Sequence, residues 1–93
     1  MFIKLYKINK RHSGYYLSVI HLNPKEILYM SEDQEMSRTF TEGKLELGLH
    51  QGASFTKLRL STKSGVEEIT VIDTPDMIET KIAKFGSKKL LRD

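Results

Sequence analysis

The sequence predicts an α+β fold: a small, mostly antiparallel β-sheet or open barrel of about five or six strands, closed by one C-terminal helix. Three observations predict it. Apolar and polar residues alternate in several short segments, turns rich in Gly, Asn and Ser separate them, and one late segment has helical spacing. At 93 residues the chain is long enough for one domain with a modest core. We expect this domain to span residues 1–86, followed by a basic tail over 87–93, ordered or disordered.

The first two predicted strands lie on either side of a cationic turn. Met1–Asn9 is rich in aliphatic, aromatic and β-branched residues, and so is Tyr15–Leu22. The residues between them are polar and end at Gly14. We therefore expect an antiparallel hairpin with a long loop.

The centre of the chain fits two interpretations. Asn23 followed by Pro24 resembles the cap and first residue of a helix, whereas the apolar run Ile27–Met30 suits a buried strand equally well. We favour one helical turn followed by a strand. Ser31–Thr41 is polar and contains several acids, so it is predicted to be an exposed loop whose later part, Met36–Thr41, forms an edge strand.

The second half contains the clearest strand patterns. Three leucines alternate with other residues, which is typical of a half-buried strand: Leu45, Leu47 and Leu49. Phe55–Ser61 and Val66–Ile72 also alternate, and a turn ending in Gly65 separates them. These two segments predict a second hairpin.

The C-terminal helix is predicted over residues 75–85. Thr74 is a suitable N-cap, and Pro75 fits the first helical position, where its missing N–H is not needed. Apolar residues at helical spacing form a stripe that would pack on the sheet: Ile78, Ile82 and Phe85. Gly86 is placed to end the helix.

The formal net charge of +3 is unevenly distributed. Residues 1–11 carry four Lys or Arg and residues 81–92 carry five, in both cases without an acid, whereas residues 12–80 carry six basic and eleven acidic residues. If the fold brings the two ends together, they form one basic surface that attracts an acidic protein patch or nucleic acid. The residues predicted to form this surface are Lys4, Lys7, Lys10, Arg11, Tyr15, Tyr16, Lys81, Lys84, Lys88, Lys89 and Arg92.

The residue types needed for most catalytic chemistry are absent or scattered. The chain has no cysteine, which excludes disulfides, thiolate catalysis and Cys-based zinc sites. His12, His21 and His50 are far apart in sequence, and none has the spacing of a metal site. No serine lies in a nucleophile elbow, and the glycines form no phosphate-binding loop. We therefore expect no enzymatic activity, metal or cofactor; a small hydrolase would require the three histidines to converge in a pocket.

These observations favour a non-catalytic accessory protein that binds and modulates a macromolecular partner, with a protein favoured over nucleic acid. The leucine segment 45–49 is a candidate sheet edge for a partner strand, although its leucines fit the domain's own core better. An edge strand of the small sheet is also compatible with a homodimer, for which no residue is specified. The alternative is a single-stranded RNA- or DNA-binding module, in which Tyr15 and Tyr16 stack on bases and the basic residues follow the phosphates.

The sequence also bears on the compartment of the protein. No segment is long and apolar enough to predict a membrane span. Met1–Lys7 has charges within its apolar stretch, unlike a signal peptide. We expect a cytoplasmic protein that does not contact a membrane.

Several short motifs follow one another along the chain: Ile3-Lys4-Leu5, then Leu22-Asn23-Pro24 with Ile27 soon after, then Thr56-Lys57-Leu58-Arg59-Leu60 before a Gly turn, and finally Glu67-Glu68 before an amphipathic helix. Together they resemble the small flagellar and swarming-motility proteins of the FlbD type. The resemblance implies a compact β-sheet domain closed by a helix and a non-enzymatic accessory role. It supplies no catalytic residues.

Overall fold

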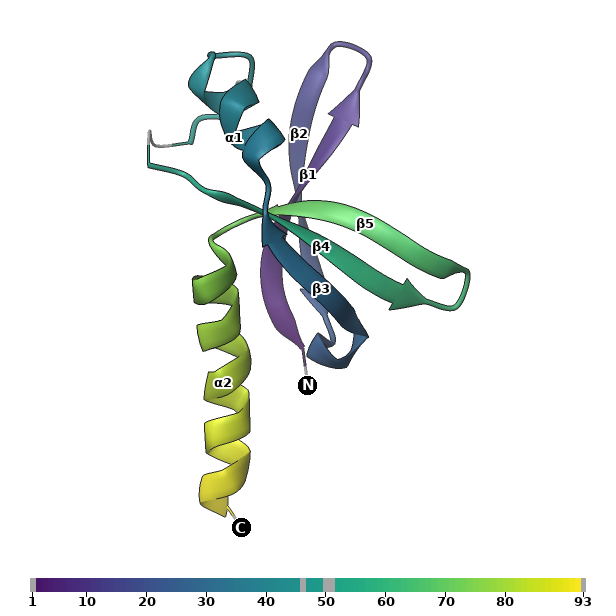
Figure 1. The fold of residues 1–93 in the computed structure, drawn as a ribbon, viewed down its shortest axis with the longest axis vertical. Helices are drawn as coiled ribbons and strands as arrows, with labels where there is room; N and C mark the ends of the chain where they lie inside the picture. Colours follow the sequence, from purple (N-terminus) through teal and green to yellow (C-terminus); the bar gives the residue numbers. More distant parts are fainter. Residues whose placement is uncertain (1, 46, 50–51, 93) are drawn as a thin grey trace.

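The computed structural model describes residues 2–45, 47–49 and 52–92. Its five antiparallel strands form one sheet in the order β2-β1-β5-β4-β3. The elements in chain order are β1 (Ile3–Arg11), β2 (Gly14–Leu22), the 3₁₀ turn η1 (Pro24–Glu26), β3 (Ile27–Glu32), α1 (Gln34–Thr41), β4 (Phe55–Thr62), β5 (Gly65–Ile72) and α2 (Pro75–Arg92). The predicted α+β class, the antiparallel sheet and the closing C-terminal helix are confirmed (Figure 1).

Apolar side chains cluster on both faces of the sheet. The larger cluster packs against α2 and consists of Ile3, Leu5, Leu22, Leu58, Leu60, Ile69, Val71 and Ile78. The smaller cluster lies against α1 and buries Ile8, Leu45 and Phe55. Successive strand residues point to opposite faces, which is why Leu5 and Ile8 of the same strand belong to different clusters. We call the two faces the α2 face and the α1 face.

The first hairpin is confirmed, but its predicted long loop is wrong. β1 continues to Arg11, which pairs with Gly14, so only His12 and Ser13 form the turn. Gly14 has a φ of 149°, a backbone conformation that side-chain-bearing residues rarely adopt. This glycine lets the chain reverse tightly, and the cationic residues assigned to a loop instead belong to a strand.

The favoured interpretation of residues 23–30 and the predicted second hairpin are confirmed. The side-chain oxygen of Asn23 accepts a hydrogen bond from the backbone N–H of Lys25 at 3.0 Å and caps η1, and β3 follows directly. β4 and β5 pair in register from Phe55 with Ile72 to Thr62 with Gly65. Their alternating apolar residues therefore enter the α2-face cluster.

The predicted loop and edge strand over Ser31–Thr41 are wrong, because Gln34–Thr41 forms α1. Oδ1 of Asp33 accepts a hydrogen bond from the Met36 backbone N–H at 2.9 Å and caps the helix. Met36 and Phe40, four residues apart, lie on one side of α1 and pack against the α1-face cluster. Asp33, one of the acids that suggested an exposed loop, is thus a buried helix cap.

The predicted leucine strand is also wrong. The described residues between α1 and β4 form an irregular connection, while Glu46 and His50 lie outside the described residues. Leu45 is buried, and Leu47 and Leu49 pack partly buried against the α1-face cluster. These leucines complete the domain's own core, so the described part of the segment offers no strand edge to a partner.

α2 begins where predicted. The Met77 backbone N–H donates to Oγ1 of Thr74 at 3.1 Å, which makes Thr74 the N-cap. Ile78 is fully buried and Ile82 packs against the α2-face cluster. The side chain of Phe85, the third residue of the predicted stripe, lies outside the described side chains.

The predicted end of this helix is wrong. α2 continues through Gly86 to Arg92, so residues 87–92 extend the helix. A single glycine costs a helix only about 1 kcal/mol. The lysines, leucines and arginine that follow favour helix, and no proline interrupts them.

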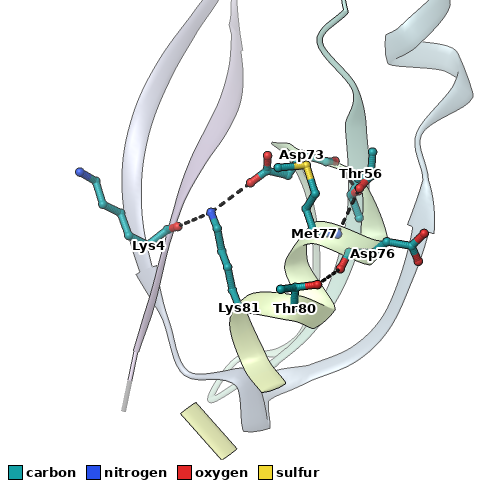
Figure 2. Close-up of polar contacts among 8 residues, drawn as sticks. Lys4, Thr56, Asp73, Asp76, Met77, Thr80 and Lys81 are labelled. Carbon is teal, nitrogen blue, oxygen red and sulfur yellow. Dashed lines mark hydrogen bonds and ion pairs between the residues drawn. The ribbon is translucent and has the colours of Figure 1, made fainter. Parts of the chain in front are cut away.

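Asp73 joins β5 to α2 in a strained conformation, with a φ of 128°. Its backbone N–H donates to the Ser54 carbonyl at 2.9 Å, and its own carbonyl accepts a hydrogen bond from Oγ1 of Thr56 at 2.6 Å. Its carboxylate lies 3.0 Å from Nζ of Lys81 (Figure 2). These contacts fix the direction in which α2 leaves the sheet.

Candidate binding surface

The β1–β2 hairpin carries basic residues and no acidic ones. We call residues 3–22 the basic hairpin; its Lys and Arg residues are Lys4, Lys7, Lys10 and Arg11. The rest of the chain carries eleven Lys or Arg against twelve Asp or Glu, which is nearly balanced. The positive charge of the protein is therefore concentrated in one hairpin.

The tip of the basic hairpin presents two tyrosines on opposite faces. On the α2 face, the guanidinium of Arg11 lies 4.0 Å from the ring centroid of Tyr16. On the α1 face, Tyr15 pairs with Lys10 and is partly buried against the α1-face cluster. A hollow of about 460 Å³ lies between this tip and the residues after α1; Lys44 lines it and pairs with Glu42 at 3.4 Å.

The other end of the basic hairpin presents apolar and cationic side chains together. Val19 pairs with Tyr6 on the α1 face, and the two are 49% and 43% exposed. The neighbouring pair is His21 with Lys4, and Nζ of Lys4 lies 5.5 Å from the ring centroid of Tyr6. This part of the α1 face is open to a partner.

Two of the predicted surface lysines contact acids of the same chain. Nζ of Lys7 lies 3.8 Å from Oε1 of Glu67. Nζ of Lys81, which pairs with Asp73, also donates to the backbone carbonyl of Lys4 at 3.4 Å (Figure 2). Lys81 thus ties α2 to β1 next to Lys4.

The remaining basic residues of α2 lie away from the hairpin tip. The tip and the C-terminal end of α2 lie at opposite ends of the molecule, whose longest extent is 49 Å (Figure 1). Lys84 is exposed on α2, whereas the side chains of Lys88, Lys89 and Arg92 lie outside the described side chains. The single basic surface expected from both ends is therefore divided, and the basic hairpin is its larger described part.

A pocket between the hairpin tip and α1 was not predicted. It has a volume of about 290 Å³ and is lined by Ile8, Lys10, Tyr15, Asp33, Glu35, Met36, Thr39, Lys57 and Thr70. Asp33 is only 5% exposed. Its Oδ2 accepts a hydrogen bond from Oγ1 of Thr70 at 2.6 Å, and its Oδ1 caps α1, so both oxygens have partners. Asp33 is therefore a structural link between α1 and β5. Met36 and Phe40, four residues apart after Asp33, are the sequence signal that could have predicted α1.

The two edge strands of the sheet differ in their protection. β3 has six residues, an irregular register between Ile27 and Tyr29, and Glu32 at its end. β2 has nine residues and contains no proline, lysine or acid. Bulges, prolines and charges are the usual means by which edge strands avoid pairing with other chains. β2 is consequently the less protected edge.

Within residues 2–45, 47–49 and 52–92, no three His, Asp or Glu side chains gather so as to hold a metal ion. His12 lies in the hairpin turn and His21 near the far end of β2, while His50 lies outside the described residues. None of the described helices is long and apolar enough to cross a membrane.

Comparison with known proteins adds no relative. No protein-family model, no curated protein and no solved structure matches the chain. The resemblance to the FlbD type stays a prediction.

Proposed function

We propose that this chain is a small, non-catalytic, cytoplasmic accessory protein that binds and modulates an acidic protein partner through the basic hairpin. One observation carries the proposal. Lys4, Lys10 and Arg11 are exposed, and no ion pair joins them to an acid among the described residues. Cations that are not neutralised within their own chain attract acidic partners and accelerate their association.

The placement of the tyrosines favours a protein partner over single-stranded nucleic acid. A base-stacking surface needs exposed aromatic rings along one face. Tyr15 and Tyr16 point to opposite faces, Tyr15 is partly buried, and Arg11 already stacks on Tyr16. The exposed ring of Tyr6 beside Lys4 is the observation that retains nucleic acid as a second candidate.

The charge of the basic hairpin can be tested by reversal. We expect immobilised wild-type protein to capture a specific acidic partner from a cell lysate, and the double variant Lys10→Glu/Arg11→Glu to lose it. The double variant Lys25→Glu/Lys63→Glu changes the net charge equally at two exposed positions outside the hairpin and should retain the partner. Equal capture by all three proteins, or robust turnover of a small molecule by the wild type, would contradict the proposal.

The nucleic-acid alternative has its own test. Binding of labelled single-stranded RNA and DNA is measured at two salt concentrations. A nucleic-acid-binding module should lose affinity steeply as salt rises, because each neutralised phosphate releases counterions. Absence of binding at low salt removes this alternative.

A further inference from the structure

The free edge of β2 lies within the basic hairpin, and this coincidence indicates how a partner would bind. Resting on the proposed function, we propose that an extended segment of the acidic partner joins the sheet as an additional strand along β2. Its side chains on the α1 face are acidic, apolar, apolar and acidic at alternate positions. Backbone hydrogen bonds supply affinity in this mode of recognition, and alternate side chains supply specificity.

The register of the hairpin identifies the backbone groups that would bind this strand. A two-residue turn makes Arg11 and Gly14 a hydrogen-bonded pair, and such pairs alternate with pairs whose N–H and C=O groups point outward. The β2 residues with outward-pointing groups are Tyr15, Leu17, Val19 and His21. In the described part of the chain no strand pairs with this edge.

The side chains of the same four residues define what the added strand should carry. They all lie on the α1 face, where the strand's alternate side chains would contact them. Leu17 and Val19, in the middle, favour apolar partners, and the exposed ring of Tyr6 extends this apolar surface.

Cations lie at both ends of this apolar middle. Lys4 lies beside His21 at one end, and Lys10 lies beside Tyr15 at the other. Arg11 lines the hollow next to Tyr15 and adds positive charge where the added strand would end, whereas Lys44 in the same lining pairs with Glu42 at 3.4 Å. Lys4 and Lys10 lie on β1, one strand in from the free edge, so carboxylates spaced six residues apart on the added strand would face them across His21 and Tyr15, in either strand direction.

Charge also argues against a second copy of this chain as the occupant. Antiparallel pairing of two β2 strands would bring two hairpins together, each with four Lys or Arg residues and no acid. These residues lie on β1 rather than on the paired β2 strands, but like charges brought near one another still repel. An acidic segment would instead neutralise these cations.

The direct test measures binding of fluorescein-labelled Thr-Glu-Thr-Val-Thr-Val-Thr-Glu-Thr by fluorescence anisotropy. We expect saturable binding that weakens about tenfold or more when glutamine replaces both glutamates. Two further peptides carry N-methyl groups either on the valines or on the threonines that flank them. Because N-methylation blocks one edge of a strand at a time, pairing predicts that one peptide loses binding and the other keeps it. Equal affinities of these two peptides would overturn strand addition.

Variants of the protein test the same edge. Val19→Pro removes one outward N–H, which an edge strand tolerates, and should weaken peptide binding about tenfold, whereas Val19→Thr keeps the N–H and should bind like the wild type. Circular dichroism checks that each variant is folded. If Val19→Pro does not fold, Lys4→Glu/Lys10→Glu is used instead and should weaken binding of the glutamate peptide while leaving the weaker glutamine peptide unaffected.

The outcomes separate this inference from the proposed function. Strand addition is overturned alone if Val19→Pro still captures the partner while Lys10→Glu/Arg11→Glu loses it. Capture that survives both changes overturns the proposed function as well. A wild-type dimer in sedimentation that Val19→Pro dissociates, without peptide binding, would identify a second copy as the occupant and also overturn the inference.

Discussion

Asp33 connects α1 and β5 through one buried side chain, so its removal should be costly. Asp33→Ala deletes the cap on α1, which contributes about 1 kcal/mol, and a hydrogen bond from Thr70 to a carboxylate, which contributes about 1.5–3 kcal/mol. We expect the free energy of unfolding to fall by about 2–4 kcal/mol. This is a large part of the roughly 5–14 kcal/mol that the length of the chain suggests.

Urea unfolding followed by circular dichroism measures this change. With a typical m value, the midpoint should fall by about 1–3 M. Glu32→Ala removes an exposed acid next to Asp33 and should change the free energy of unfolding by less than about 0.5 kcal/mol. Thr70→Val removes the same hydrogen bond from its other end, so the double variant should cost less than the two single changes together. Equal midpoints for Asp33→Ala and Glu32→Ala, or full additivity with Thr70→Val, would refute this reasoning.

Three further substitutions test the packing. Ile78→Ala removes a fully buried side chain and should lower the free energy of unfolding by about 2–5 kcal/mol. Met77→Ala, at an exposed neighbouring position, should change it by less than about 0.5 kcal/mol. Similar losses at both positions would show that α2 does not pack as described. Leu45→Ala should lower the free energy of unfolding by about 2–5 kcal/mol in thermal unfolding, because this leucine is buried in the core. An unchanged Tm would show that the segment lies at the surface. Gly65→Ala should cost about 1 kcal/mol or more in the same assay, since Gly65 has a φ of 124°; a neutral result would mean that the turn adapts.

The elements that could be predicted are those with local determinants. The β4–β5 hairpin follows from alternation on both sides of Gly65, and the start of α2 follows from Thr74 and Pro75. Neither depends on distant parts of the chain. The class and the closing helix followed from these local patterns.

The errors arose where one pattern suits two structures. Leu45, Leu47 and Leu49 alternate as in a strand, but an irregular chain also delivers them to the α1-face cluster. α1 is short and largely polar, and only two apolar residues anchor it. Its cap, Asp33, is local, but the Thr70 hydroxyl that also binds Asp33 comes from a position 37 residues away.

The candidate surface was predictable in composition but not in arrangement. The basic residues of the hairpin are visible in the sequence. The hydrogen bonds from Lys81 to Asp73 and to the Lys4 carbonyl depend on where α2 packs. The free edge of β2 depends on the strand order, which pairs β1 with β5 and leaves β2 outermost.

The junction between β1 and β5 has a consequence for how the chain folds. Only two residue pairs, Lys7 with Val71 and Ile8 with Thr70, form this junction, and Ile8 and Thr70 lie 62 positions apart. Both hairpins close short loops and can form early, whereas the junction closes a long one at a higher entropic cost. We therefore expect joining of the two hairpins to limit the folding rate. Until it occurs, both faces of the basic hairpin remain in contact with water, and a strand that captured β2 at that stage would act on folding rather than on the finished protein.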